Sequence, residues 1–79
     1  MYFVYYLKSD KNNDLYIGST ENVNKRLGQH NKGRVKSTKP YHPWKLLGYE
    51  EYPTRNEAMM REKFLKSHQQ KEILKKKFY

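Results

Sequence analysis

Arg26 and His30 stand four residues apart in a segment whose apolar residues, Val23 and Leu27, have helical spacing. Residues at this separation lie one turn apart on the same face of a helix. A guanidinium neutralises negative charge and an imidazole moves protons near neutral pH, so the pair suits chemistry at a phosphate. The solvated face of a helix in a basic protein would show the same pattern. Spacing alone leaves both interpretations open.

Tyr5 and Tyr16 form a second candidate pair. Residues 2–8 are aromatic and β-branched and residues 15–18 have the same character, which predicts the two strands of a hairpin. A hairpin closed symmetrically around residues 10 and 11 would place Tyr5 directly opposite Tyr16, with both side chains on one face. Such a pair either packs the sheet, as cross-strand aromatic residues commonly do, or brings two hydroxyl groups to a site.

Ala58, Met59 and Leu65 mark the inward arc of a predicted helix. Glu62 is an acidic residue within this arc, at helical spacing from Ala58 and Leu65. A carboxylate in apolar surroundings is costly unless it finds a cation, a metal ion or hydrogen-bond donors. A neighbouring lysine or arginine is one candidate partner, and a metal ion is the other. The sequence does not decide between them.

Other site chemistries are excluded by the residues available. The chain has no cysteine, so it has no disulfide, no thiolate metal site and no cysteine nucleophile. His42 and His68 lack a ligand-type partner three or four residues away, so no zinc site is expected. Glu50 and Glu51 would face opposite sides of a strand and could not act as a carboxylate pair.

The hairpin is expected to lead into a first helix that positions Arg26 and His30. Ser19 or Thr20 would cap this helix, Glu21 would lie in its first turn, and it would run to about Lys32. Gly33 is a suitable residue just beyond its C-terminus.

The rest of the chain predicts one more strand and two more helices. Residues 44–52 read as a strand, and Thr54 and Glu57 form a capping box that opens a helix through about residue 66. A last helix over residues 69–78 would turn Ile73 and Leu74 inward. The order ββ-α-β-α-α predicts an α/β (α+β) fold, a small three-stranded sheet flanked by helices.

Composition predicts one small domain, residues 1–79, with a thin core. The apolar residue types with glycine number 24 of 79, about 30% where about 45–50% is usual, although eight tyrosines add buried ring area. No run approaches the roughly 18 apolar residues of a membrane span, and no signal peptide is predicted. We therefore expect a cytoplasmic protein that does not associate with membranes.

The net charge of +9, from 17 Lys and Arg against 8 Asp and Glu, implies an anionic partner, with nucleic acid ahead of acidic membranes or proteins. The basic residues form two clusters outside the predicted site. Either cluster is a solvated face or a contact surface for a phosphate backbone. One lies in the loop before the third strand and the other in the last helix: Arg34, Lys36 and Lys39, then Lys71, Lys75, Lys76 and Lys77.

Taken in order, the candidate residues resemble the GIY-YIG nucleases. Phe3-Val4-Tyr5 stands where the family has its first triplet, and Tyr16-Ile17-Gly18 is the second triplet unaltered. The intervals to Arg26 and His30 are similar to those of the family, and Glu62 stands where the family has its metal-binding glutamate. The match therefore extends over residues 3–62 and covers all three candidate sites.

Two further stretches, residues 29–33 and 57–63, look most like the small stand-alone bacterial branch of that family. This branch is related to the N-terminal nuclease module of the excision-repair incision subunit. The resemblance therefore implies a role in bacterial DNA repair, with the protein associated with the nucleoid when it binds DNA.

The resemblance implies hydrolysis of one DNA strand with a single divalent ion, Mg²⁺ or Mn²⁺, bound by Glu62. Tyr5 or Tyr16 would position and deprotonate the attacking water, and His30 would accept the proton of Tyr5. Arg26 would neutralise charge on the pentavalent phosphate. DNA, including branched or nicked DNA, is the expected partner, with specificity for DNA structure or supplied by a protein partner.

The chain departs from the family pattern at three places. Phe3 replaces the first glycine of the motif, Ser19 stands where some relatives have a lysine, and no asparagine follows Asn56. These differences leave the proton path open. The alternative function is a module that kept the fold and binds nucleic acid without cutting it. A third possibility is a structural protein-interaction domain, but such a domain would not use the positive charge.

Overall fold

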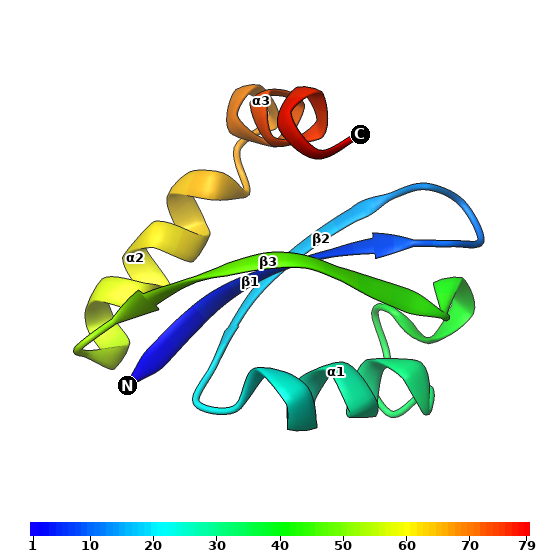
Figure 1. The fold of residues 1–79 in the computed structure, drawn as a ribbon, viewed down its shortest axis with the longest axis horizontal. Helices are drawn as coiled ribbons and strands as arrows, with labels where there is room; N and C mark the ends of the chain where they lie inside the picture. The colour runs from blue at the N-terminus through cyan, green and yellow to red at the C-terminus, as the bar shows by residue number, and fades with distance from the viewer.

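The computed structural model of the protein describes residues 1–79. Three antiparallel strands form a sheet in the order β2-β1-β3, with α1 on one face and α2 and α3 on the other (Figure 1). The elements are β1 (Tyr2–Ser9), β2 (Leu15–Thr20), α1 (Val23–Asn31), the short 3₁₀ helix η1 (Lys39–Tyr41), β3 (Trp44–Tyr52), α2 (Arg55–Leu65) and α3 (His68–Phe78). The predicted fold class and element order are confirmed.

The hairpin register differs from the symmetric prediction by two residues. Tyr5 lies opposite Gly18, and Tyr16 lies opposite Leu7. The loop is longer than expected because Ser9 Oγ accepts hydrogen bonds from the backbone N–H groups of residues 11 and 12 and the chain turns at Asn13, which has φ 61°. Side chains alternate with a period of two, so this shift keeps both tyrosines on one face and makes them diagonal neighbours.

The start predicted for α1 is wrong, and the end is correct. β2 continues to Thr20, which pairs with Phe3, so neither Ser19 nor Thr20 can cap the helix. Asn22 is the cap instead, and its side chain accepts a hydrogen bond from the N–H of Lys25. The helix ends before Gly33, whose φ of 71° suits glycine at that position.

The helix α2 begins where its predicted cap places it, and α3 begins one residue before the predicted start at residue 69. Thr54 Oγ1 accepts from the N–H of Glu57 at 3.2 Å, so the capping box of α2 is confirmed. Ser67 caps α3 in the same way by accepting from the N–H of Gln70. No helix combines the length and the apolar character that crossing a membrane requires.

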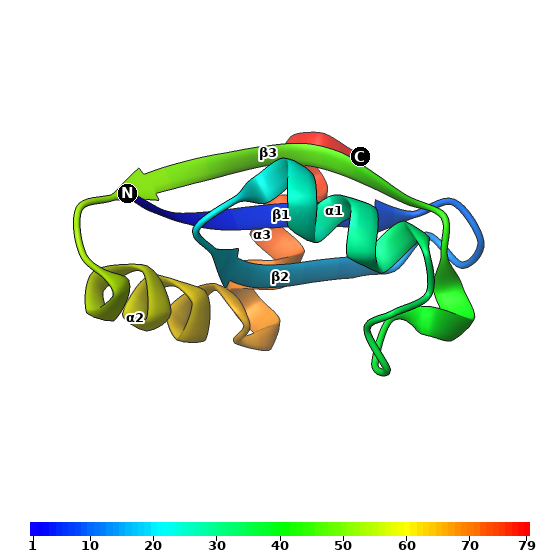
Figure 2. The ribbon, with the colours of Figure 1, turned by 90° about the horizontal axis from the view of Figure 1, so that it is seen from below.

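The core is divided by the sheet. Seven buried residues, including Val4, Ile17 and Leu65, form a cluster on the side of α2 and α3. Only three buried residues, Tyr5, Leu7 and Trp44, form the cluster on the side of α1. Figure 2 shows α1 lying alone across that face of the sheet.

Two apolar residues predicted to face inward lie outside this core. Met59 is 50% exposed and Ile73 is 52% exposed, whereas Ala58, Leu65 and Leu74 are buried as expected. Since α2 and α3 each cover a narrow sheet, the apolar stripe that each helix can bury is also narrow. The thin core that the composition predicts is therefore present.

Candidate active site

Gly18 allows the two tyrosines of the sheet to converge. The Tyr5 and Tyr16 rings have centroids 6.2 Å apart on the α1 face. A Cβ atom at position 18 would lie 2.6 Å from Tyr5 Oη and 3.0 Å from Tyr16 Cε2, closer than such contacts occur. The glycine is therefore required for the close approach of these side chains and not for an unusual backbone conformation.

His30 is fully buried at the end of α1 and contacts both tyrosines. Tyr5 Oη and His30 Nε2 are hydrogen bonded at 2.9 Å, and the Tyr16 ring centroid lies 4.9 Å from that of the imidazole. Burial raises the pKa of Tyr5 to about 12. Burial and the charge of Arg26 lower the pKa of His30 to about 4. Both side chains are therefore neutral at physiological pH.

Arg26 lies one turn before His30 on α1 and is partly buried. Its Nη1 donates to Gln29 Oε1 at 2.9 Å, which orients the guanidinium. The guanidinium acts to lower the pKa of Tyr5, partly offsetting the effect of burial. The structure thus brings Tyr5, Tyr16, Arg26 and His30 together, as the sequence predicted.

Glu62 approaches the same region from α2. Its carboxylate pairs with Lys66 Nζ at 2.7 Å, one turn further along the helix, and its side chain is 21% exposed. The cation alternative left open by the sequence is therefore present in the structure. The negative charge of Glu62 acts to raise the pKa of Tyr5, so the carboxylate and the phenol lie within electrostatic reach of each other.

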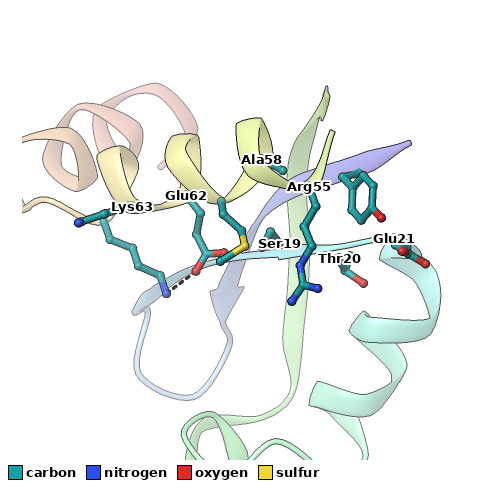
Figure 3. Close-up of a pocket in the computed structure, with 10 residues that line it drawn as sticks. Ser19, Thr20, Glu21, Arg55, Ala58, Glu62 and Lys63 are labelled. Atoms are coloured by element: carbon teal, nitrogen blue, oxygen red, sulfur yellow. Dashed lines mark ion pairs between the residues drawn. The ribbon is translucent and has the colours of Figure 1, made fainter. Parts of the chain in front are cut away.

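Glu62 lines a hollow of about 570 Å³ between α2 and the end of β2 (Figure 3). The dashed line in Figure 3 marks its ion pair with Lys66. A second hollow of about 390 Å³ lies beside α1 and is lined by Lys25, Arg26 and Gln29. The two hollows share Ser19, Thr20 and Glu21, so they meet at the end of β2.

Three cations in the first hollow had no place in the sequence-based prediction of the site. They are Arg55, Lys63 and Lys66, all carried by α2 or its C-terminal cap. Figure 3 shows Arg55 extending from the start of α2 toward β2. Their spacing of eight and three residues is helical and could have placed them on the side of Glu62. The sequence contains so many lysines that this signal does not stand out.

Thr38 is the other residue that the sequence analysis missed. It is 1% exposed, in a segment expected to be only a basic loop, and its Oγ1 lies 2.7 Å from His30 Nδ1. Trp44 Nε1 donates to the carbonyl oxygen of Thr38 at 3.1 Å and fixes the loop against β3. Nothing in the local sequence indicates that this hydroxyl is buried, because the contact joins residues on two different segments.

The basic residues predicted to contact nucleic acid lie away from these hollows. Arg34, Lys36 and Lys39 are exposed in the loop after α1. The lysines of α3 lie on the opposite face of the sheet from α1 (Figure 1), and one of them, Lys75, is 3.9 Å from Glu72. No hydrogen bond or ion pair joins either group to the candidate catalytic residues.

The donor set near Glu62 fits a weakly held divalent ion. No group of three or more His, Cys, Asp or Glu residues is present, so the protein cannot enclose a metal ion with its own ligands. Mg²⁺ is commonly held by one or two carboxylates together with water and substrate phosphates. Glu62 faces a hollow with room for such ligands, so the residues present fit an ion of this kind.

The comparisons with known proteins identify the class. Residues 1–77 match the family described as the GIY-YIG catalytic domain. The chain belongs to the GIY-YIG family, whose nuclease domains generally use divalent metal ions and act on DNA. The resemblance noted from the sequence is thereby confirmed, and a nuclease-type function is supported.

Its relatives are small proteins of similar length. A UPF0213 protein of Staphylococcus haemolyticus is 39% identical over 75 residues, which cover 94% of this chain and 90% of the relative. One from Staphylococcus epidermidis is 37% identical over the same coverage. The solution NMR structure of a UPF0213 protein from Bacillus halodurans is 32% identical, with a TM-score of 0.57, covering 94% of this chain and 82% of that one. These relatives support the small stand-alone bacterial branch.

Proposed function

We propose that the protein is a divalent-metal-dependent endonuclease that incises one strand of DNA. The observation that carries the proposal is the hydrogen bond between Tyr5 and His30, formed within electrostatic reach of Arg26 and Glu62. A phenol with an adjacent neutral base, a cation and a carboxylate supplies the groups that phosphodiester hydrolysis requires. The same arrangement has no evident purpose in a protein that only binds.

Tyr5 and His30 act together as the base in this mechanism. A tyrosine with a pKa of about 12 provides almost no phenolate at neutral pH. The proton of the attacking water therefore moves to Tyr5 Oη as the proton of Tyr5 moves to His30 Nε2. Tyr16 lies against both rings and holds their orientation, and Gly18 leaves the space in which they meet.

Arg26 and Glu62 act on the phosphate from its two sides. Arg26 neutralises the charge that develops on the phosphoryl oxygens. The chemistry that a divalent ion supplies when held by Glu62 is charge stabilisation at the scissile phosphate and at the leaving 3′ oxygen. In the structure the Glu62 carboxylate pairs with the ammonium of Lys66. This ion pair would have to break for Glu62 to hold a divalent ion.

A strand crossing the two hollows at the end of β2 would pass both Glu62 and Arg26. Arg55 and Lys63 would then contact its phosphates on the α2 side and Lys25 on the α1 side. The loop cluster Arg34, Lys36 and Lys39 and the lysines of α3 would extend these contacts outward. Since phosphate contacts carry no sequence information, selectivity for branched or nicked DNA, or a protein partner, would direct incision. DNA repair in a bacterial cell is the setting that this activity fits.

One observation favours the alternative of a non-catalytic nucleic-acid-binding module. The Glu62–Lys66 ion pair satisfies the carboxylate without any metal ion. A protein that had lost cleavage would show this same pairing, and its hollows would still accept a phosphate backbone. The two functions therefore differ in whether Glu62 is needed for cutting or only for stability.

Substitution of Glu62 by glutamine tests the choice. Plasmid, branched and flapped DNA would be incubated with wild type and Glu62→Gln in Mn²⁺, in Mg²⁺ and in EDTA. We expect wild type to nick DNA only with metal, and Glu62→Gln to bind DNA but not cleave it, because the amide lacks the charge that the cation needs. The melting temperature of wild type, but not of Glu62→Gln, should rise with Mn²⁺.

Lys63→Gln is the matched control, because it changes a neighbouring charged residue of the same hollow. It should retain Mn²⁺-dependent cleavage with weaker DNA binding. If wild type never cuts and shows no metal-dependent shift in melting temperature, while Glu62→Gln is less stable, the binding module is the correct function.

A further inference from the structure

The hydrogen bonds of His30 extend beyond Tyr5 to a second buried hydroxyl. His30 Nδ1 lies 2.7 Å from Thr38 Oγ1, and Thr38 Oγ1 lies 3.3 Å from the carbonyl oxygen of Val35, to which it can donate. Tyr5, His30 and Thr38 are each no more than 1% exposed. The three side chains and the Val35 carbonyl thus form a chain of hydrogen bonds in which water takes little part.

Only one arrangement of protons satisfies this chain. With the imidazole proton on Nδ1, Tyr5 O–H donates to Nε2, Nδ1–H donates to Thr38 Oγ1, and Thr38 O–H donates to the Val35 carbonyl. With the proton on Nε2, the imidazole donates to Tyr5 Oη, and the Tyr5 hydroxyl proton then has no acceptor within the protein. A buried donor without a partner is costly, so the first arrangement is favoured.

We propose that Thr38 is a positioning residue that holds His30 in the Nδ1–H tautomer, which keeps Nε2 free to accept the proton of Tyr5. This inference rests on the proposed function, in which Tyr5 deprotonates the attacking water. The water proton passes to Tyr5 Oη, the Tyr5 proton passes to Nε2, and the resulting imidazolium stays bonded through Nδ1–H to Thr38. The hydroxide forms the new bond to phosphorus as the bond to the 3′ oxygen breaks.

The surroundings of Thr38 are suited to this task. Its backbone N–H donates to the Val35 carbonyl at 3.1 Å, and its own carbonyl accepts from Trp44 Nε1 and from the N–H of Tyr41. Three hydrogen bonds therefore hold the backbone of Thr38, which fixes the place from which its hydroxyl reaches His30. Because the low pKa of His30 keeps the imidazole neutral at physiological pH, the ring carries a single proton, which lies on either Nδ1 or Nε2.

The loop that carries Thr38 also carries three of the cations predicted to contact DNA. Lys36 and Lys39 stand on either side of Thr38, and the N–H of Lys39 donates to the same Val35 carbonyl at 2.9 Å. The loop that would meet the DNA backbone and the hydroxyl that contacts the imidazole are therefore parts of one turn of chain.

The tautomer can be measured directly, without any cleavage. The ¹⁵N chemical shifts and one-bond couplings of the His30 ring in wild-type protein should show a proton on Nδ1 and none on Nε2. In Thr38→Val, which keeps the shape and removes the hydroxyl, we expect a population of the Nε2–H tautomer to appear. Thr38→Ser should restore the wild-type spectrum, because serine returns the hydroxyl at the same position.

Cleavage kinetics supply the second arm of the test. Thr38→Val should lower kcat about tenfold, within the range that general-base catalysis contributes, with KM for DNA changed less than twofold. Thr38→Ser should recover most of kcat. Ser37→Ala is the matched control, since it removes a neighbouring exposed hydroxyl of the same loop, and it should change neither the spectrum nor kcat.

A wild-type spectrum with the proton on Nε2 would overturn the inference, whether or not Thr38→Val folds. So would a Thr38→Val protein that keeps both the Nδ1–H tautomer and the wild-type kcat. If wild type does not cleave DNA at all, the proposed function fails, but the spectra of wild type, Thr38→Val and Thr38→Ser still decide the role of Thr38.

Discussion

In the proposed mechanism Tyr5 combines two properties that usually exclude each other, burial of its ring and a hydroxyl that must exchange a proton. The ring is part of the small cluster with Leu7 and Trp44, and the hydroxyl is bonded to His30. Burial raises the pKa of Tyr5 to about 12, which makes the neighbouring imidazole necessary if the phenol is to act as a base. Packing and chemistry therefore impose separate demands on one side chain.

Replacing Tyr5 by phenylalanine separates these demands. Tyr5→Phe keeps the ring, so the protein should fold, with stability lower by about 1–3 kcal/mol because His30 Nε2 loses its partner. Cleavage should fall by about 10²–10⁴ because the proton acceptor for water is gone. Single-turnover cleavage and urea unfolding measure the two effects.

Tyr49→Phe provides the comparison, because Tyr49 is an exposed tyrosine of β3 opposite Tyr5 in the sheet. It should cleave like wild type. A Tyr5→Phe protein that cuts as fast as wild type would transfer the role of base to Tyr16 or to His30.

At the scale of the elements, the site depends on how α1 and α2 flank the end of β2. α1 brings Lys25 and Arg26 to one hollow, and α2 brings Glu62, Arg55 and Lys63 to the other. α3 takes no part in either hollow and packs Phe78 against Tyr6 on the opposite side of the sheet. The path of a bound strand therefore favours the cations of α2 over the lysines of α3.

Two double variants of equal charge test that path. Arg55→Ala with Lys63→Ala, and Lys76→Ala with Lys77→Ala, each remove two positive charges, and all four residues are exposed. The logarithm of DNA affinity should fall with the logarithm of salt concentration, with a slope of about −0.9 for each duplex phosphate neutralised. The α2 variant should lose nearly two such contacts and the α3 variant fewer, on every DNA sequence alike.

Fluorescence anisotropy in EDTA at several salt concentrations measures these slopes. A larger loss in the α3 variant would place the strand over α3 instead. Binding that is independent of salt, or absent at low salt, would argue against nucleic acid as the partner.

The elements were largely predictable because their signals are local. The Thr54–Glu57 capping box, the turn at Gly33 and the apolar strand at residues 44–52 depend only on neighbouring residues. The start of α1 was not predictable, because Ser19 and Thr20 have the right types for a cap but are held in β2 by pairing with β1. The hairpin register failed for a related reason, since the hydrogen bonds of Ser9 Oγ lengthen the loop.

In the site, too, some features follow from local sequence and others depend on contacts between distant segments. Spacing and family resemblance select Tyr5, Tyr16, Arg26, His30 and Glu62, and the first four prove to be neighbours. Spacing could not show that Thr38 reaches His30, because that contact depends on the path of the loop between α1 and β3. The Glu62–Lys66 pair has the i,i+4 spacing of a helical ion pair, but among so many lysines this signal does not stand out.

For the whole molecule, the protonation of His30 should make the free energy of unfolding depend on pH. His30 is buried and neutral, and its pKa is lowered to about 4. In the unfolded chain its pKa is about 6.5, so the unfolded state binds more protons between these values. Stability should therefore fall as the pH decreases through this window.

We expect the free energy of unfolding to decrease by about 3 kcal/mol between pH 7 and pH 4, at about 1.4 kcal/mol for each pKa unit. Urea titrations at half-unit intervals down to pH 5 would show most of this before the carboxylates contribute. Glu50, whose pKa is lowered by its bonds to Tyr52, Tyr6 and Arg61, adds a loss only at lower pH. A His30→Gln variant should be nearly flat above pH 5, and a wild type that is equally flat would contradict a buried neutral His30.

The core is unequal, with seven buried residues on the face of the sheet covered by α2 and α3 and three on the face covered by α1. The larger cluster supplies most of the buried apolar contacts, and the smaller cluster lies beside the proposed catalytic residues. Val4, Ile17 and Leu74 of the larger cluster lie on the opposite face of the sheet from Tyr5 and Tyr16, whereas Ala58 and Leu65 share α2 with Glu62. The smaller cluster contains Tyr5 itself, and its Trp44 packs against Tyr16. We therefore expect substitutions that fill the larger cluster around Val4 and Leu74 to raise stability without loss of the proposed activity, whereas a change in the smaller cluster should alter the fold and the proposed reaction together.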